Sequence, residues 1–346
     1  MNAFAVAIRA LEGAPVPDSL ALLGIDYLCA TANRRLAAEP PEAEAAFARD
    51  MAAHPVALNT DEANAQHYEL PPEFFTLALG PQRKYSCCLY WNDDDSLDEA
   101  EEHALAETAA HAGLADGQEI LELGCGWGSL SLWMARHYPG SRIVSVSNSH
   151  GQRRFIEAEA ARLGLTNLRV ITCDMNLFDA DTLWRRFDRV VSVEMFEHMS
   201  NWPELLARVR GWLKPDGRAF LHVFTHRSTP YRFDASDRAD WIARHFFTGG
   251  VMPSHGLIRR FGGLFEVETE WRWSGEHYRR TAMDWLANFD RNDAEIRKVL
   301  AGVYGRDAAL WRRRWRLFFL AVAGLFGHAG GEEWGVSHYL LKPAEG

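Results

Sequence analysis

Hydrophobic residues follow two different periods along the middle of the chain. Short runs rich in β-branched residues, EILEL (119–123), RIVSVS (142–147) and LRVITC (168–173), fit buried strands. Between them, SLSLWMARHY (129–138) and GQRRFIEAEAARLGL (151–165) place apolar residues on one face of a helix. Strands that alternate with helices in this way predict parallel βαβ units with both faces of the sheet covered. The expected fold is therefore α/β, with a doubly wound sheet.

The alternation extends from about residue 96 to residue 225. It starts with a helix over SLDEAEEHALAETAAHAGL (96–114) and ends with strand FDRVVSVE (187–194), helix NWPELLARVRGWL (201–213) and strand GRAFLHVF (217–224). Before it, the Ala- and Glu-rich segment 34–54 has a helical composition that prolines 40 and 41 interrupt.

The last third of the chain is less regular and rich in aromatic residues. Two strand-like runs, LFEVETEWRW (264–273) and WGVSHYLLK (334–342), enclose helices expected from about 279 to 326. We therefore expect three regions: an N-terminal helical region (1–72), a ligand-binding core (73–225), and substrate-capping helices with the last strands of the sheet (226–346).

One of these helices carries a broad apolar face and several arginines. The apolar positions recur at helical spacing: Trp311, Trp315, Phe318, Phe319, Val322 and Phe326. The arginines crowd its first half: Arg312, Arg313, Arg314 and Arg316. A core helix with solvated arginines is the favoured interpretation. A lid over an apolar substrate and a contact with a membrane surface stay open as alternatives.

Composition excludes several classes of function. The formal net charge of -10 argues against a nucleic-acid partner, because phosphate binding needs a basic face. The five cysteines show no metal or disulfide spacing, so we expect reduced thiols, a cytoplasmic protein and no metal site. The first residues lack the pattern of a secretory signal, and the longest apolar run, 317–326, is too short to span a bilayer.

The segment LELGCGWGSL (121–130) places three glycines directly after a predicted strand and before a predicted helix. Gly124 and Gly126 can adopt backbone angles closed to other residues and let a ligand approach, while Gly128 allows close packing of helix on strand. The spacing G-x-G-x-G differs from the dinucleotide fingerprint G-x-G-x-x-G. It resembles the first motif of class I methyltransferases, a Rossmann-like fold that binds S-adenosylmethionine.

The ends of the next two strands carry polar groups that suit this cofactor. The resemblance implies that Ser147 and Gln152, with Asn148 between them, meet the ribose, and that Asp174 and Met175 meet the adenine. Each has a structural alternative, since Asp174 could cap a turn and Ser147 could bond loop backbone. Suitable groups at three successive strand ends favour the ligand, because α/β sheets bind ligands at that edge. Cys125, inside the glycine turn, joins the expected cofactor site.

Further segments narrow the resemblance to the cyclopropane-fatty-acid-synthase-like methyltransferases, and within them to the coclaurine N-methyltransferases. These segments are HYELPPEFFTLALGPQRKYSCCLYW (67–91), VSVEMFEHMSNW (191–202), FLHVFTH (220–226), DWIARHFFTGGVMP (240–253), EHYRRTAMDWL (276–286) and EEWGVSHYLLKP (332–343). The FFTGG and EEWGVSHYLLK segments favour the amine-methylating branch over the lipid synthases.

The resemblance also implies roles for particular residues. Tyr85 and Ser86 close over the cofactor, while Glu194, Glu197 and His198 face the substrate. In the lipid synthases a bicarbonate ion acts as the base, and the positions that match its ligands are Cys87, Glu197, His222 and Tyr278. All four residues are present, so they do not separate the two branches.

An amine acceptor needs a base and an anionic partner, because it arrives mostly protonated at neutral pH. His198, with an ordinary pKa near 6.5, is the expected base, Glu197 the expected cation anchor, and Glu194 an aid to substrate or cofactor. His222 and Tyr278 are further catalytic candidates, although a buried structural histidine is the alternative at 222. An aromatic wall for the substrate is expected from Trp241, Phe326, Trp334 and Tyr339, with core packing as the alternative for each.

These observations predict a methyltransferase that acts on the nitrogen of a small aromatic or cyclic amine. One alternative is transfer to an alkene in a lipid acyl chain with bound bicarbonate as the base. A second alternative is a non-catalytic protein that binds S-adenosylmethionine. A homodimer is a candidate for the assembly.

Overall fold

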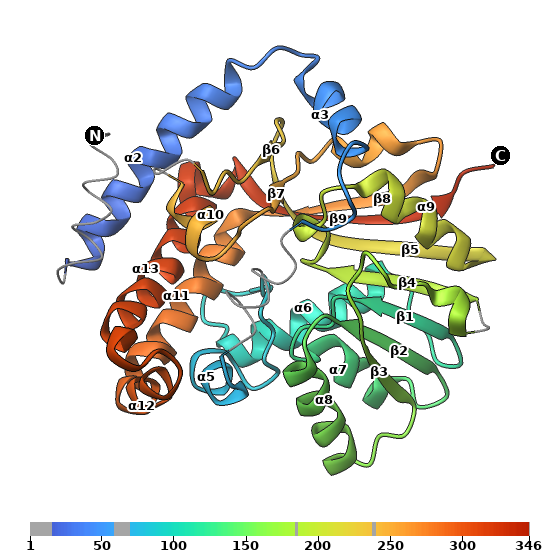
Figure 1. The fold of residues 1–346 in the computed structure, drawn as a ribbon, viewed down its shortest axis with the longest axis horizontal. Helices are drawn as coiled ribbons and strands as arrows, with labels where there is room; N and C mark the ends of the chain where they lie inside the picture. The colour runs from blue at the N-terminus through green and yellow to red at the C-terminus, as the bar shows by residue number, and fades with distance from the viewer. Residues whose placement is uncertain (1–15, 59–69, 184–185, 237–239, 346) are drawn as a thin grey trace.

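A computed structural model describes residues 16–58, 70–183, 186–236 and 240–345 (Figure 1). The start of the chain, on which the expectation of no secretory signal rests, lies outside the described residues. So do the first three residues of the segment 67–91.

A seven-stranded sheet with the order β3-β2-β1-β4-β5-β9-β8 forms the centre of the fold. Its strands are β1 (Glu119–Leu123), β2 (Arg142–Ser147), β3 (Leu168–Thr172), β4 (Phe187–Val193), β5 (Leu213–His226), β8 (Phe265–Trp273) and β9 (Trp334–Pro343). The first five are parallel, as predicted, whereas β9 pairs antiparallel with both β5 and β8. The strand order reverses between β1 and β4, and sheets of this kind bind ligands at the carboxyl ends of the strands at such a point.

Helices cover both faces of the sheet, as the alternating pattern predicts (Figure 1). One face carries α6 (Leu97–His111), α7 (Ser129–His137) and α8 (His150–Arg162), and the other carries α9 (Trp202–Trp212). Trp133 and Met134 of α7 pack with Ile120 of β1, while Trp202 of α9 packs with Leu121 on the opposite face. Adjacent residues of β1 thus belong to different cores, because successive side chains of a strand point to opposite faces.

A group of helices packs beside the carboxyl ends of the parallel strands (Figure 1). Its members are α2 (Asp18–Ala37), α5 (Pro72–Ala78), α10 (Trp241–His245), α11 (Gly275–Arg291), α12 (Asp293–Tyr304) and α13 (Ala308–Gly327). The interruption predicted at Pro40 and Pro41 is confirmed, because α2 ends at Ala37 and the next helix, α3 (Ala43–Met51), starts beyond them. Shorter elements are β6 (Tyr231–Arg232), β7 (Val251–Met252), η1 (Ala180–Leu183), η2 (Phe196–His198), η3 (Leu257–Phe261), η4 (Gly305–Asp307) and η5 (His328–Gly331).

The aromatic stripe predicted at 311–326 lies on α13 and faces inward. Trp315 and Phe319 are almost fully buried in the largest apolar cluster. Arg316 forms ion pairs with Asp18 and Asp290, so this arginine ties α13 to α2 and α11. This burial fits the interpretation as a core helix, while Phe318, Val322 and Phe326 of the same helix also line a cavity, which fits the alternative of a lid over a substrate. Within the described residues, no helix is both long enough and apolar enough to cross a membrane.

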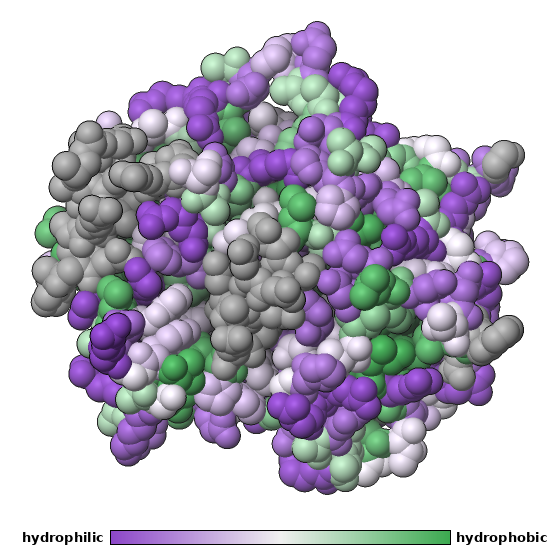
Figure 2. All heavy atoms as spheres, viewed as in Figure 1, coloured by the Kyte–Doolittle hydropathy of each residue, from purple (hydrophilic) through white to green (hydrophobic). Residues whose placement is uncertain are grey.

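Figure 2 shows a surface on which polar and apolar residues are mixed. Purple, hydrophilic spheres border most of the green, hydrophobic ones in this view. Such an intermixed surface is ordinary for a folded protein, where much of the exposed area is apolar.

Candidate active site

The glycine turn after β1 has the left-handed backbone angles that the sequence predicts. Gly124, Gly126 and Gly128 have φ angles of 80, 52 and 81°, which residues with a Cβ rarely adopt. A Cβ on Gly124 would lie 2.4 Å from Met195, and one on Gly128 would lie 2.6 Å from Ile156, whereas one on Gly126 would meet nothing within 4 Å. The first and third glycines therefore permit close packing, and Gly126 is the one that leaves open space.

This turn borders a cavity of about 1100 Å³ that opens to solvent. Eight of the ten residues expected at the cofactor line it: Tyr85, Ser86, Gly124, Cys125, Gly126, Ser147, Asn148 and Gln152. The other two, Asp174 and Met175, line a smaller adjoining cavity that also includes Ser147 and Asn148. We call the two together the cofactor cavity.

Hydrogen bonds distinguish the polar groups in the cofactor cavity. The Ser147 hydroxyl donates to Gln152 Oε1 at 2.7 Å and accepts from the Ser149 N–H at 2.9 Å, so it supports the loop. The Gln152 Nε2 amide is buried and has no hydrogen-bond partner among the described residues. Asp174 accepts from the Asn176 N–H at 2.8 Å. The structural alternatives proposed for Ser147 and Asp174 therefore hold, and Gln152 keeps a donor for a ligand.

A second, largely aromatic cavity of about 750 Å³ adjoins the first. The apolar side chains that line it come from β5 and from the capping segments: Phe224, Phe233, Ile242, Phe247, Met252, Tyr278, Trp285, Phe318, Val322, Leu325 and Phe326. Tyr85, Glu194 and His198 line both cavities. We call the second one the aromatic cavity.

Of the four residues expected in an aromatic wall, Phe326 lines the aromatic cavity and the other three do not. Trp241 packs beside Phe246 in the apolar cluster. The Trp334 N–H donates to the Tyr231 hydroxyl at 3.2 Å, and the Tyr339 hydroxyl donates to a backbone oxygen at 2.7 Å. These three positions have the core packing given as their alternative.

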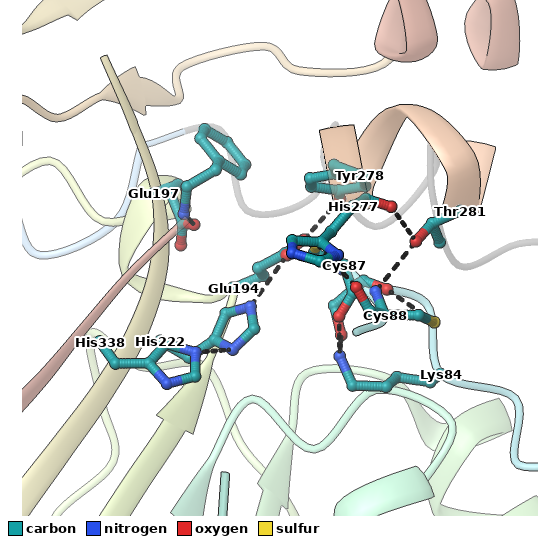
Figure 3. A network of polar contacts seen from close by, with 12 residues as sticks. Lys84, Cys87, Cys88, Glu194, Glu197, His222, His277, Tyr278, Thr281 and His338 are labelled. Carbon is teal, nitrogen blue, oxygen red and sulfur yellow. Dashed lines mark hydrogen bonds and ion pairs between the residues drawn. The ribbon is translucent and has the colours of Figure 1, made fainter. Parts of the chain in front are cut away.

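Glu194 follows β4 at the point where the strand order reverses. Its φ angle of 47° is unusual for a residue with a side chain. Oε1 accepts from the Cys87 N–H at 2.9 Å and lies 3.2 Å from His222 Nε2, while Oε2 accepts from the Tyr278 hydroxyl at 2.6 Å (Figure 3). Burial raises the pKa of this carboxyl above its ordinary value, and the positive charge of Lys84 opposes the shift. Three partners thus fix a buried carboxylate at the junction of the two cavities.

Lys84 is a buried cation in this site that the sequence analysis missed. Its ammonium donates to the Ser86 hydroxyl and to the backbone oxygen of Cys87 (Figure 3). Only 1% of its surface is exposed, although lysine is almost never fully buried without such partners. The one available signal was its place beside Tyr85 and Ser86 in the segment that was expected to close over the cofactor.

Glu197 and His198 are adjacent on η2 but occupy different surroundings. Glu197 is fully buried, accepts from the Phe224 N–H at 2.6 Å and lines neither cavity. Burial and, second, the negative Glu194 raise the pKa of Glu197 well above its ordinary value. His198 lines both cavities and packs 4.4 Å from the Phe247 ring. Burial lowers the pKa of His198 to about 4, so the imidazole is neutral at pH 7.

The four positions that the resemblance matches to bicarbonate ligands do not surround a separate ion site. The Cys87 N–H, the His222 imidazole and the Tyr278 hydroxyl all contact the Glu194 carboxylate. Glu197 is held instead by backbone. The residues present therefore fit a carboxylate that belongs to the chain, and they do not fit an added bicarbonate. No group of histidine, cysteine, aspartate and glutamate that could hold a metal ion occurs among the described residues.

Comparisons with known proteins show the family to which the chain belongs. The family model described as mycolic acid cyclopropane synthetase matches residues 57–328. A (S)-coclaurine N-methyltransferase of Thalictrum flavum subsp. glaucum is 35% identical over 83% of this chain and 80% of its own. A cyclopropane-fatty-acyl-phospholipid synthase of Escherichia coli (strain K12) is 33% identical over 65% of this chain and 55% of its own.

Among solved structures, coclaurine N-methyltransferase bound to N-methylheliamine and SAH superposes with a TM-score of 0.91. It is 31% identical, and the match covers 98% of this chain and 99% of the other.

Proposed function

The chain belongs to the mycolic acid cyclopropane synthetase family and is an S-adenosylmethionine-dependent methyltransferase, and we propose that it methylates the nitrogen of a small aromatic or cyclic amine. The proposal rests on one observation above all. Glu194 places a carboxylate of the chain itself at the junction of the cofactor cavity and the aromatic cavity.

The polar groups of the cofactor cavity suit S-adenosylmethionine. When bound, this cofactor supplies an electrophilic methyl group on a positively charged sulfur. Gly126 leaves its backbone open to a ligand, and the unpartnered Gln152 amide suits a ribose hydroxyl. Asp174 and Met175, in the adjoining part, suit the adenine. Tyr85 and Ser86 cover the cavity from the segment that carries Lys84.

The aromatic cavity suits an amine that carries an apolar ring. Phe247, Tyr278 and Phe326 give it ring faces, which attract ammonium ions. Glu194 gives it a negative charge at the end that meets the cofactor cavity. An ammonium would thus be drawn to the place where methyl transfer occurs.

Burial assigns the roles of base and orienting group differently from the sequence analysis. A general base works best when its pKa lies near the working pH. Burial lowers the pKa of His198 to about 4, which takes it further from a working pH near 7. Burial raises the pKa of Glu194, which brings it closer to that pH. We therefore assign the base and the cation partner to Glu194, and the orientation of the nitrogen to the neutral His198.

Glu197, which the sequence analysis assigned as the cation anchor, has a supporting role in this proposal. Its carboxyl is fully buried and lines neither cavity, and burial and the negative Glu194 raise its pKa well above the ordinary value, which opposes the negative charge that an anchor needs. Its bond to the Phe224 N–H holds η2 against β5 and thereby places His198.

The Glu194 carboxylate also favours an amine over a lipid alkene as the methyl acceptor. A neutral alkene gains nothing from a fixed negative charge, whereas an ammonium does. The lipid chemistry also needs bicarbonate, and three of the groups matched to that ion contact Glu194 instead.

The proposal is tested by incubating the purified chain with S-adenosylmethionine and a library of cyclic and aromatic amines. Mass spectrometry should find products heavier by one methylene unit, together with S-adenosylhomocysteine. The matched arm uses vesicles of phospholipids with unsaturated acyl chains, in which no modified lipid is expected. Methylated or cyclopropanated lipid with no methylated amine would refute the proposal. Cofactor binding by calorimetry without turnover in either arm would identify a protein that only binds the cofactor.

A further inference from the structure

Three histidines form a hydrogen-bonded row that leads away from Glu194. His222 Nε2 lies 3.2 Å from Glu194 Oε1, and His222 Nδ1 lies 2.8 Å from His338 Nε2 (Figure 3). His338 Nδ1 lies 2.8 Å from His111 Nδ1. Each of the first two rings thus uses one nitrogen toward the site and the other away from it.

The row ends at the protein surface. His111 Nε2 lies 3.0 Å from Glu107 Oε1, one turn earlier on α6, and 36% of the Glu107 side chain is exposed. By contrast, His222 and His338 are fully buried. The contacts therefore form one continuous path from the junction of the two cavities to water.

The fold fixes the positions of these rings. His222 and His338 are direct partners in the pairing of β5 with β9. Trp273 of β8 packs 4.3 Å from His338, and Trp271 of the same strand stacks on His111 at 3.8 Å. These indole rings pack against His338 and His111 and hold the two imidazoles in place.

We propose that the row formed by His222, His338, His111 and Glu107 carries to solvent the proton that the acceptor amine loses. This proposal rests on the proposed amine methylation, because an ammonium that becomes methylated releases one proton for each methyl group transferred.

The transfer balances without any further reactant. Once Glu194 has taken the amine proton, that proton moves to His222 Nε2 while the proton on His222 Nδ1 moves to His338 Nε2. The proton on His338 Nδ1 moves to His111 Nδ1, and the proton on His111 Nε2 moves to Glu107 and then to water. Only N–H and O–H bonds form and break.

The electrostatic surroundings agree with neutral rings. Burial lowers the pKa of His222 and His338 well below the ordinary value, and the Lys84 ammonium lowers both further. Burial also lowers the pKa of His111, although Glu107 opposes that shift. The other titratable neighbours of the row are Glu194 and, through it, Tyr278. A neutral imidazole donates through one nitrogen and accepts through the other, as the relay requires.

The test compares His338→Gln and His111→Ala with His103→Gln, a control on the same helix as His111 and outside the row. In the two row variants, kcat should fall about tenfold, less than the loss on removing a base that touches the substrate. KM for the amine should stay unchanged, and the solvent deuterium isotope effect on kcat should rise. Added imidazole should restore the His111→Ala variant. The control should behave as wild type.

Unchanged kcat in both row variants would overturn the proposal. So would a loss with no change in isotope effect and no rescue by imidazole, because that pattern belongs to a purely structural role. A second measurement does not depend on turnover: nitrogen-15 spectra of histidine-labelled wild-type protein should show neutral rings at 222 and 338, and an imidazolium at either would overturn the relay. A wild-type protein that methylates no amine would refute the proposed function, and the spectra would then decide the relay alone.

Discussion

Replacing Glu194 with Gln separates its charge and basicity from its shape. The amide has the same size, so its oxygen can still accept from the Cys87 N–H while its NH₂ group faces the Tyr278 hydroxyl, which can turn to accept. The fold should therefore tolerate the change. The variant loses both the negative charge that meets the ammonium and the group that takes its proton.

The expected loss in kcat/KM for the amine is at least about 100-fold, the lower end of what a general base contributes. That factor corresponds to about 2.7 kcal/mol of transition-state stabilisation. Wild-type kcat/KM should fall about tenfold per pH unit below the raised pKa of Glu194, because only the ionised carboxylate accepts a proton. This acidic limb should be absent from the pH profile of the variant.

Two measurements control for a general disturbance of the site. Calorimetric affinity for S-adenosylhomocysteine should match wild type, because its sulfur carries no charge for Glu194 to attract. Glu197→Gln, the matched control at the neighbouring buried carboxyl, should retain most of the activity, since the amide oxygen can still accept from the Phe224 N–H. Losses of similar size in the two variants, or a parallel loss of S-adenosylhomocysteine binding, would refute the division of roles.

Three further variants test the rest of the site. His198→Ala should lower kcat/KM about tenfold or more while affinity for S-adenosylhomocysteine stays near wild type; equal losses in both would argue against a role confined to the amine. Gln152→Ala should weaken S-adenosylhomocysteine binding about three- to tenfold in calorimetry, the usual value of one hydrogen bond, and an unchanged Kd would contradict the ribose contact. Gly128→Ala should lower Tm, because the new Cβ would meet Ile156 at 2.6 Å with φ at 81°; an unchanged Tm would count against the packing role.

The sequence predicted the parallel part of the sheet closely. Strands 119–123 and 142–147 have the bounds expected, because a short run rich in Ile, Leu and Val, bordered by glycine and polar residues, marks a buried strand well. The strand expected at 217–224 instead covers Leu213–His226, because Leu213 already pairs with Phe187 before the bulge in β4 and β5. The antiparallel pairing of β9 was not foreseen, since β5, one of its two partners, lies more than a hundred residues earlier in sequence.

Some residues of the active site were predictable from the sequence and others were not. Residues at successive strand ends were predictable, because parallel strands bring their carboxyl ends to one edge of the sheet. The contrast between Glu194 and Glu197 was not, because it depends on the left-handed backbone of Glu194 and on the turn at η2. His111 and His338 join the site only through the pairing of distant elements, so no local pattern marks them.

A carboxylate built into the chain and a bound bicarbonate ion have different consequences for the acceptor. The Glu194 carboxylate is part of the chain and contacts three partners, so it does not leave the site between turnovers. Its burial without a full counter-charge is unfavourable, as the raised pKa shows, and a cationic acceptor is the group that relieves this. A neutral acceptor would enter the aromatic cavity without that gain. In the proposed function the preference for amines thus follows from the energy of one buried charge, and the ring faces of the aromatic cavity, which also attract ammonium ions, add to it.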